Sequence, residues 1–314
     1  MRGRGLGDLV INVGMIGVSE GNGHPYSYSA IINGYDKDLM RESGWRPIYD
    51  YLSKRRDDEF GVDGLRITHV WTQDPGETGR IAAASRIDSK CGEYEEMIGR
   101  VDAVIIARDD WRAHIDLARP FLEHGTPVFL DKPLSLDVGQ LRYFRKYLES
   151  GTLMSCAAMR YAEELDEYRR IRARAKLKYI HGSVIGDWER YGVHMLDGIF
   201  SCNPVTVRSV HAFGGEALTT VLQCDDETRI VVSCLGKCPK TFNIAAFSET
   251  EKWSFEFSDN FSAFKRMLNG FRDMLVHKVI PIDPEHTINI MRILMACNLS
   301  LNRNASVYLD EIRI

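Results

Sequence analysis

Apolar segments of strand length alternate with helical segments along the first half of the chain, and this alternation constrains the fold more than any other feature. Nearly continuous apolar runs indicate strands that are covered on both faces. Such runs occupy residues 10–18, 65–72, 101–107 and 128–130. Helices are expected over residues 26–32 and 76–85, then from a cap at Asp109 or Asp110 to Glu123, and from a cap at Ser135 to Ser150. Repeated strand–helix units predict an α/β domain with a parallel, doubly wound sheet.

The second half of the chain has a different pattern, in which strand-like runs follow one another closely. These runs are residues 153–158, 179–186, 205–213, 217–224, 228–235, 241–248 and 252–257. Helices are expected over residues 163–176, 190–201, 260–277 and 284–301. Strands in series predict an α+β domain with a large, mostly antiparallel open sheet. The change of pattern places the domain boundary near Gly151, which gives domains of residues 1–150 and 151–314, and residues 35–64 are interpreted as an insertion with one short helix over residues 48–55.

The composition excludes several classes of protein. The 40 Lys and Arg residues against 44 Asp and Glu residues give a net charge of −4, so there is no basic excess for a nucleic-acid backbone. No apolar run approaches the roughly 18 residues of a membrane span, and the N-terminus lacks the apolar centre of a signal peptide. The seven cysteines are scattered, which favours reduced thiols in the cytoplasm. Only Cys234 and Cys238 lie close together, without a second pair at zinc spacing, so no metal site is expected.

A glycine-rich turn follows the first apolar strand. It reads Gly17-Val18-Ser19-Glu20-Gly21-Asn22-Gly23-His24. A turn between a strand and a helix is suited to binding phosphate, because the amides at the helix N-terminus point at the anion and glycine lets the backbone approach it. The spacing departs from Gly-x-Gly-x-x-Gly, since Ser19 takes the place of the second glycine. Gly17, Ser19, Asn22, Gly23 and His24 are therefore candidates for cofactor binding, and the alternative is a turn that only joins strand to helix.

Two further motifs follow in order. The strand at residues 101–107 leads through a polar loop and a helix to a second strand, which ends in Asp131-Lys132-Pro133, and residues 192–197 read Gly-Val-His-Met-Leu-Asp. With these motifs and the change from α/β to antiparallel pattern, most of the chain resembles the Gfo/Idh/MocA oxidoreductase family of glucose-fructose and inositol dehydrogenases. The family signature has Glu-Lys-Pro where this chain has Asp131 first, and the family's Gly-x-His-x-x-Asp segment is similar to residues 192–197.

The resemblance implies an N-terminal Rossmann domain that binds NAD or NADP. It also implies a C-terminal domain whose open sheet shapes the substrate pocket and forms the interface of a homo-oligomer. The implied reaction is hydride transfer between nicotinamide and an oxygen-bearing carbon of a sugar, a polyol or a related acid, so the expected partner is a small-molecule substrate. A different class of function is the alternative: a nucleotide-binding sensor or regulator that keeps the fold without turnover.

Two residues are candidates for the chemistry. Lys132 ends a buried strand at the edge of the sheet where ligands bind, and its amine can stabilise charge that develops on a reacting oxygen; the alternative is a surface lysine. By the resemblance, His194 exchanges the proton of the reacting hydroxyl, for which imidazole is suited near neutral pH. Otherwise it is a packed helix histidine. Asp197 is three residues further on, where it either orients the imidazole or anchors the helix.

Further residues are candidates for binding substrate. Arg190 stands four residues before His194, where the family usually has Asp, and a guanidinium at this position either binds an anionic group or is exposed at the start of the helix. Tyr191 follows it directly. Arg160, just past a strand at the start of the second domain, either faces the pocket or has a structural role.

The remaining candidates for cofactor binding follow from their positions at strand ends. Thr72 lies at the end of the second strand, where many family members have Asp for the ribose hydroxyls, so NAD and NADP both stay open. Arg108 and Asp109 follow the third strand, near where the family holds nicotinamide and ribose. Asp131 and Lys132 complete the set at the end of the fourth strand.

Overall fold

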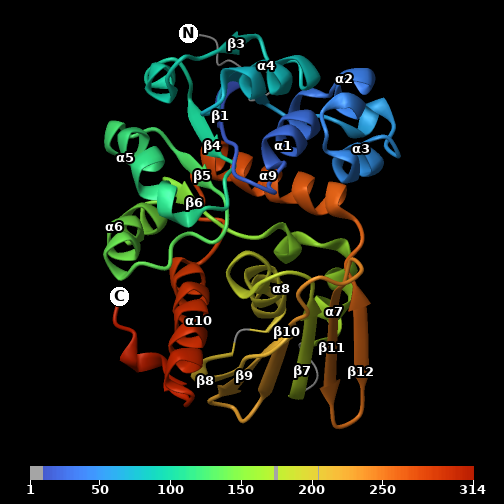
Figure 1. Ribbon diagram of the computed structural model, residues 1–314, viewed down its shortest axis with the longest axis vertical. Helices are drawn as coiled ribbons and strands as arrows, with labels where there is room; N and C mark the ends of the chain where they lie inside the picture. The colour runs from blue at the N-terminus through green and yellow to red at the C-terminus, as the bar shows by residue number, and fades with distance from the viewer. Residues whose placement is uncertain (1–9, 173–175, 204) are drawn as a thin grey trace. The chain divides into compact units, whose positions relative to one another are not determined.

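The computed structural model describes residues 10–172, 176–203 and 205–314, which form two compact units (Figure 1). The first unit comprises the chain as far as Asp131 together with Phe144–Ser155 and Phe264–Ile282. The second unit comprises Lys132–Tyr143, Cys156–Ala263 and Asp283–Ile314. The chain therefore passes between the two units several times, where the sequence predicts one boundary near Gly151.

The first unit contains a sheet of six parallel strands in the order β3-β2-β1-β4-β5-β6. The strands are β1 (Ile11–Ile16), β2 (Leu65–Trp71), β3 (Ser89–Lys90), β4 (Ala103–Ile106), β5 (Val128–Leu130) and β6 (Leu153–Met154). Every residue of β4 and β5 is buried, which the continuous apolar runs predict. The doubly wound α/β domain is thus confirmed. The strand order reverses between β1 and β4, and the carboxyl ends of strands beside such a point are where ligands bind.

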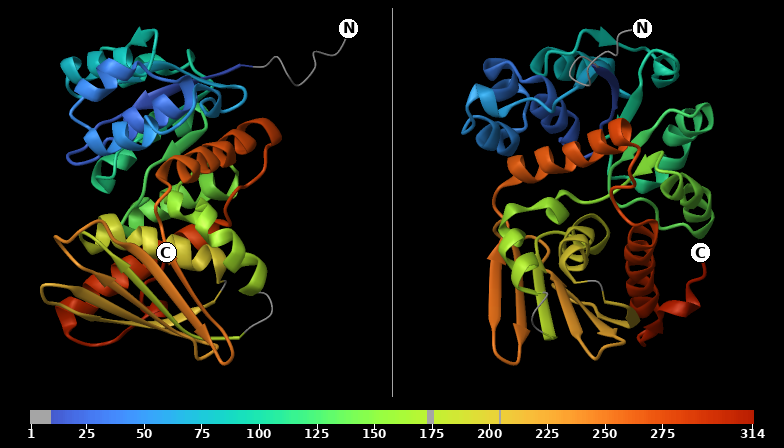
Figure 2. Two further views of the ribbon diagram at one scale, coloured as in Figure 1. Left: turned by 90° about the vertical axis from the view of Figure 1, so that its right-hand side faces the viewer. Right: turned by 180° about the vertical axis from the view of Figure 1, so that it is seen from behind.

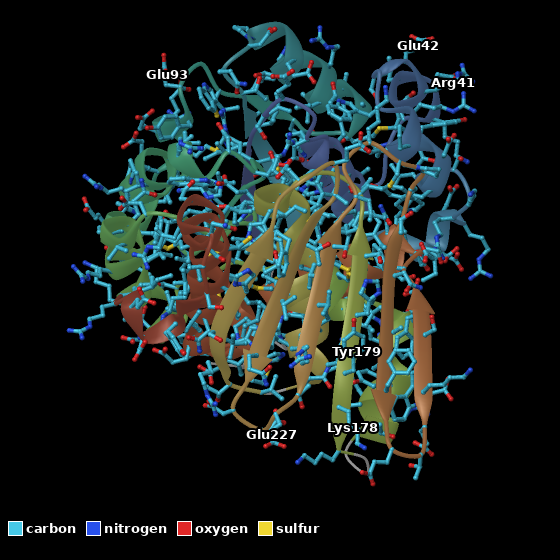
Figure 3. All side chains as sticks on the ribbon, turned by 60° about the horizontal axis from the view of Figure 1, so that its bottom comes forward. Arg41, Glu42, Glu93, Lys178, Tyr179 and Glu227 are labelled. Carbon is cyan, nitrogen blue, oxygen red and sulfur yellow. The ribbon has the colours of Figure 1, made fainter. Side chains whose placement is uncertain are left out.

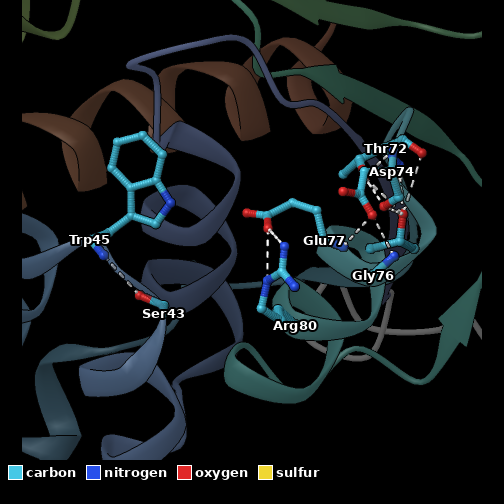
Figure 4. A network of polar contacts seen from close by, with 8 residues as sticks. Ser43, Trp45, Thr72, Asp74, Gly76, Glu77 and Arg80 are labelled. Carbon is cyan, nitrogen blue, oxygen red and sulfur yellow. Dashed lines mark hydrogen bonds and ion pairs between the residues drawn. The ribbon is translucent and has the colours of Figure 1, made fainter.

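Helices cover both faces of this sheet. They are α1 (His24–Asn33), α4 (Pro75–Ala84) and α5 (His114–His124), with parts of α6 (Val138–Glu149) and α9 (Asn260–His277). Helices α1 and α4 contact β2, and α5 contacts β4 and β5. Asp74 begins α4 by accepting the N–H groups of Gly76 and Glu77 (2.7 and 3.1 Å; Figure 4). Gly125 ends α5 in the left-handed conformation (φ 87°), as its sequence predicts.

The predicted caps of α5 and α6 are wrong. Helix α6 begins after Asp137, whose Oδ1 accepts the N–H of Gln140 (2.8 Å). Ser135 Oγ instead accepts the N–H of Asp137 (3.1 Å), before the helix begins. Asp110 pairs with Arg108 (Nη2–Oδ2 2.6 Å), and a short 3-10 turn, Trp111–Ala113, separates it from α5. In both cases the side chain that was predicted to bond the first amides of the helix bonds a nearer polar group.

The insertion forms two helices, α2 (Lys37–Glu42) and α3 (Arg46–Leu52), followed by a 3-10 turn at Asp57–Glu59. The sequence predicts one helix over residues 48–55. Asp36, whose carboxylate accepts two amides of the first turn of α2, is the local signal that was overlooked. Side chains of the insertion cover the start of α1: a Cβ on Gly23 would lie 2.6 Å from Trp45 and 2.5 Å from Ile48.

The second unit contains a sheet of seven strands in the order β12-β11-β7-β10-β9-β8-β13, in which only the pair β7–β10 is parallel. The strands are β7 (Leu177–Val184), β8 (Val207–Phe213), β9 (Leu218–Cys224), β10 (Arg229–Cys234), β11 (Phe242–Ser248), β12 (Lys252–Glu256) and β13 (Val307–Tyr308). The predicted mostly antiparallel sheet is confirmed.

Helices of the second unit pack on one face of its sheet (Figure 2). They are α8 (Val193–Cys202) and α10 (Pro284–Arg303), with α7 (Asp166–Arg172) beside α8. Residues 173–175, in the predicted helix over residues 163–176, lie outside the described residues. Along β7 the buried Ile180 and Val184 alternate with more exposed residues, so Tyr179 lies on the opposite face, where its ring meets Phe247 of β11 (6.1 Å between centroids; Figure 3).

Candidate active site

Lys132 is buried, with 4% of its surface exposed, and lies directly after the first unit's β5 and Asp131. Its Nζ donates a hydrogen bond to the backbone carbonyl of Arg190 (3.1 Å). Both residues belong to the second unit. The structure therefore joins the Asp-Lys-Pro motif to the segment that precedes His194, through the backbone of Arg190.

That segment is a π-helical turn, Trp188–Gly192, which is a geometry found often at functional sites. The carboxylate of Asp187 accepts the N–H of Arg190 (2.8 Å) and so fixes the start of the turn. The ring of Tyr191 lies on the backbone of Gly186, where an added Cβ would approach the ring within 2.2 Å. Because the turn is wider than an α-helix, α8 begins at Val193 and not near residue 190 as predicted.

His194 is the second residue of α8 and is partly exposed. Aromatic side chains surround its ring: Tyr191 lies 6.1 Å away between centroids, and Phe242 meets it edge to face at 5.9 Å. The imidazole is therefore packed between one ring from the π-helical turn and one from β11. Lys132 and His194 are thus brought to the same segment of the second unit.

Asp197, one turn further along α8, is buried and accepts three hydrogen bonds. They come from the amide of Ala157 (2.7 Å), Nε of Arg160 (2.8 Å) and the ring of His286 (Nε2–Oδ1 3.3 Å). Burial opposes ionisation, but Arg160 and His286 outweigh it and hold the pKa of Asp197 below its usual value. Nη2 of Arg160 is buried without a hydrogen-bond partner among the described residues.

The sequence analysis did not identify His286, which lies on α10 and is not part of a recognisable motif. Its side chain lines a cavity of about 500 Å³ within the second unit, between α10, the start of β8 and residues 308–310. Neither Lys132 nor His194 lines this cavity. Asp197, on the same helix as His194, is therefore bonded to a residue that lines a separate cavity.

The glycine-rich turn of the first unit uses several of its polar groups internally. Asn22 Oδ1 accepts the N–H of His24 (2.8 Å), and the carbonyl of Gly23 accepts the N–H groups of Tyr26 and Ser27 (3.1 and 3.2 Å). A Cβ on Gly17 would lie 2.3 Å from Pro25, which shows how closely the backbone of β1 approaches α1. The first amides of α1 are thus bonded within the chain.

Side chains at the ends of β1 and β4 are also bonded to one another. Ser19 Oγ donates to the carboxylate of buried Asp109 (2.7 Å), so Asp109 faces the turn and does not cap α5. At the end of β5, the carboxylate of Asp131 accepts Nδ2 of Asn22 (3.0 Å) and meets Nδ1 of His24 (2.5 Å). The structure therefore brings five of the predicted cofactor residues together in the first unit.

Gln73, which follows Thr72 at the end of β2, was not predicted as a site residue. Its amide bonds both the N–H and the carbonyl of Val18 (3.2 and 2.6 Å), and Nη1 of Arg108 donates to its Oε1 (3.0 Å). The hydroxyl of Thr72 donates to the carbonyl of Asp74 (2.7 Å), within the turn before α4. Its position directly after β2 is the signal that could have identified Gln73.

Among the described residues, no cluster of three or more His, Cys, Asp or Glu side chains has an arrangement that holds a metal ion. Likewise, no helix in the described ranges has the length and apolarity needed to cross a membrane.

Comparison with protein families gives one match. Residues 11–154 match the Gfo/Idh/MocA model, described as an oxidoreductase family with an NAD-binding Rossmann fold. Over these residues the chain is similar to the Gfo/Idh/MocA oxidoreductase family. The resemblance inferred from the motifs is thereby confirmed, and a nicotinamide dinucleotide is the cofactor class of that family's fold. A comparison with curated protein sequences gives no match.

Solved structures of inositol dehydrogenases share the fold of nearly the whole chain. Apo scyllo-inositol dehydrogenase from Lactobacillus casei is 12% identical, with 97% of this chain and 100% of that chain covered at a TM-score of 0.78. Myo-inositol 2-dehydrogenase from Lactobacillus plantarum is 14% identical, with 95% and 99% covered at a TM-score of 0.76. The Lactobacillus casei enzyme with NAD(H) and scyllo-inositol is 12% identical, with 96% and 99% covered at a TM-score of 0.75.

The donors at the edge of the first sheet fit a dinucleotide. Asn22 and Arg108, at the carboxyl ends of β1 and β4 beside the reversal of strand order, have more N–H groups than their bonds to Asp131, Asp110 and Gln73 use, whereas the one proton of Ser19 Oγ is donated to Asp109. Because the first amides of α1 are bonded within the chain, the donors that suit a phosphate here are mainly side chains. The residues present therefore match the cofactor class of the family, with a glycine turn that departs from the usual fingerprint.

Proposed function

We propose that this chain is an NAD(P)-dependent oxidoreductase that transfers a hydride between nicotinamide and a hydroxyl-bearing carbon of a sugar, polyol or related acid. The observation that carries the proposal is the buried amine of Lys132, held by the carbonyl of Arg190 in the turn that leads to His194. The match of residues 11–154 to the family model supports it, as does the fold shared with inositol dehydrogenases.

Lys132 supplies the positive charge in this scheme. A buried ammonium keeps its hydrogen-bonding strength because little water competes with it, so it stabilises negative charge on a reacting oxygen. The bond to the carbonyl of Arg190 fixes the direction of the amine. Lys132 is therefore proposed to bind the substrate oxygen and to polarise it.

His194 is proposed to exchange the proton of that oxygen. An imidazole both accepts and donates a proton near neutral pH, and the rings of Tyr191 and Phe242 hold its plane. The bound dinucleotide supplies the hydride acceptor or donor. Tyr191, Arg160, Asp197 and the side chain of Arg190 are proposed to contact or to support the substrate.

The residues proposed to hold the dinucleotide lie in the first unit or at its border. They are Gly17, Ser19, Asn22, Gly23, His24, Thr72, Arg108, Asp109, Asp131 and Lys132. A homo-oligomer through the open face of the second sheet is also proposed, because an exposed aromatic pair, Tyr179 and Phe247, lies on it.

The test measures NADH and NADPH formation from a panel of inositols, other polyols and aldoses, first with the wild-type chain and then with Lys132→Ala and His194→Ala. Both variants are expected to lose at least about a hundredfold in kcat, the usual contribution of an acid–base or electrostatic group. Lys178→Ala and His277→Ala, at exposed positions, are the matched controls. Unchanged rates in both site variants would disprove the assigned roles, and tight cofactor binding without turnover would favour a sensor.

A further inference from the structure

His24 and Asp131 form the closest polar contact in the glycine-rich turn. Nδ1 of His24 lies 2.5 Å from Oδ2 of Asp131, and the carboxylate is fully buried at the end of β5. Nδ2 of Asn22 donates to the same oxygen (3.0 Å). When the Asp131 carboxylate is ionised it only accepts hydrogen bonds, so the proton of this contact then lies on Nδ1. Asp131 therefore selects one tautomer of the imidazole.

Packing fixes the plane of the ring as well. Tyr28, one turn along α1, stacks on it at 4.8 Å between centroids and places its hydroxyl 3.0 Å from Nδ1. Phe264 of α9 meets it edge to face at 5.3 Å. Asp131 and Tyr28 are the titratable groups in these contacts, and α9 contributes only a hydrocarbon ring. The imidazole thus has a fixed orientation before any ligand binds.

The opposite edge of the ring is the part available to a ligand. The side chain is 19% exposed, and among the described residues no hydrogen bond is made to Nε2. With the proton on Nδ1, a neutral imidazole presents Nε2 as an acceptor. The ring starts α1 at the carboxyl edge of the first sheet, where ligands of such sheets bind.

We propose that His24 contacts the bound ligand directly, with Nε2 accepting a hydrogen bond from a ligand hydroxyl, and that Asp131 is its positioning residue. This deepens the proposed function, on which it rests for the nature of the ligand. The hydroxyl belongs either to a ribose of the dinucleotide or to the substrate. The role of the Asp131 carboxylate is then to orient the imidazole of His24.

The first experiment observes the ring without turnover. The full chain is labelled with ¹⁵N-histidine, and His24→Gln assigns the resonances. We expect a protonated Nδ1 with a far-downfield Nδ1 proton, which Asp131→Asn abolishes. NADH alone and NADH with myo-inositol are then added as separate probes. A shift of Nε2 with NADH alone identifies a ribose hydroxyl, and a shift only with myo-inositol identifies the substrate.

The second experiment measures NADH affinity by nicotinamide fluorescence across pH. If the hydroxyl is a ribose hydroxyl, His24→Gln is expected to weaken binding roughly three- to tenfold, the effect of one lost hydrogen bond. Asp131→Glu, which has the family's residue, recovers part of what Asp131→Asn loses. His277→Gln, the same substitution at an exposed position of the first unit, is the matched control. Should Asp131→Asn fail to fold, as thermal unfolding would show, His24→Gln alone still decides the proposal.

Two results would overturn the proposal. One is an Nε2 resonance that responds to neither probe. The other is an NADH affinity that rises in acid and loses this rise in His24→Gln, because an imidazolium that binds the diphosphate, and not an acceptor for a hydroxyl, behaves in this way. Failure of the proposed function is recognised separately, as the absence of turnover on the substrate panel, since the resonance and affinity measurements require none.

Discussion

Replacement of Asp197 by alanine is expected to destabilise the second unit strongly. The carboxylate is 2% exposed and accepts hydrogen bonds from the amide of Ala157, Nε of Arg160 and the ring of His286. Its removal leaves the guanidinium of Arg160 buried without a counter-charge. Breaking a buried ion pair in this way costs about 3–5 kcal/mol. The free energy of unfolding of a typical domain is only about 5–15 kcal/mol, so Asp197→Ala removes a large part of it.

The loss of stability in Asp197→Ala is expected to become smaller as the pH falls. Burial by itself would raise the pKa of Asp197, but Arg160 and His286 lower it overall. A carboxyl group whose pKa is lower in the folded state stabilises the fold at pH values above its unfolded pKa of about 3.9. That contribution is lost as the pH falls through the folded pKa. The difference between wild type and Asp197→Ala should therefore be constant near neutral pH and should shrink below about pH 4.

Urea denaturation followed by circular dichroism and tryptophan fluorescence measures the difference. The matched control is Asp225→Ala, since the ion pair of Asp225 with Arg208 lies in the same unit but both side chains are 55% exposed. That pair should contribute no more than about 1 kcal/mol. Arg160→Leu combined with Asp197→Leu should be less destabilising than the sum of the two single changes, because no buried charge is left. Equal costs for Asp197→Ala and Asp225→Ala would refute the reasoning.

Three further predictions follow from single positions. Gly125→Ala should lower the free energy of unfolding by about 1 kcal/mol, because φ is 87° there, whereas Gly79→Ala, in α4 with open space around it, should raise it by up to about 1 kcal/mol; urea titrations compare the two. Burial raises the pKa of Cys234 to about 12, so a thiol reagent should modify half-buried Cys238 first and Cys234 only on unfolding, and equal rates in the native chain would contradict this. Tyr179→Glu should dissociate an oligomer that uses the open sheet face, as light scattering after size exclusion would show, and an unchanged mass would exclude that interface.

Local signals in the sequence were sufficient for most elements of the fold. The buried run at residues 101–107 gives β4, and Gly125 ends the helix that follows, because burial on both faces and a left-handed cap each depend on a few neighbouring residues. Helix boundaries were less predictable where several polar side chains stood together. At Ser135 and Asp110 a competing partner decided which group was used, and the sequence does not rank such competitors.

The candidate site divides in the same way. The motifs identified Lys132 and His194 as candidates, since their order along the chain and their neighbours could be read directly. The bond of Lys132 to the carbonyl of Arg190 could not be read, because it joins residues 58 positions apart through a backbone atom that every residue has.

The sequence by itself determined the two kinds of sheet, the resemblance to a family and the two residues with the strongest claim to the chemistry. Only the tertiary structure decided which charges are neighbours: His286 reaches Asp197 across 89 positions of the chain, and Asp131 binds His24 across 107. Hydrophobic periodicity and caps act over one or two turns of chain, so they leave a pattern in the letters. The pairing of buried polar groups depends on how distant segments pack, and the sequence records it only as isolated residues.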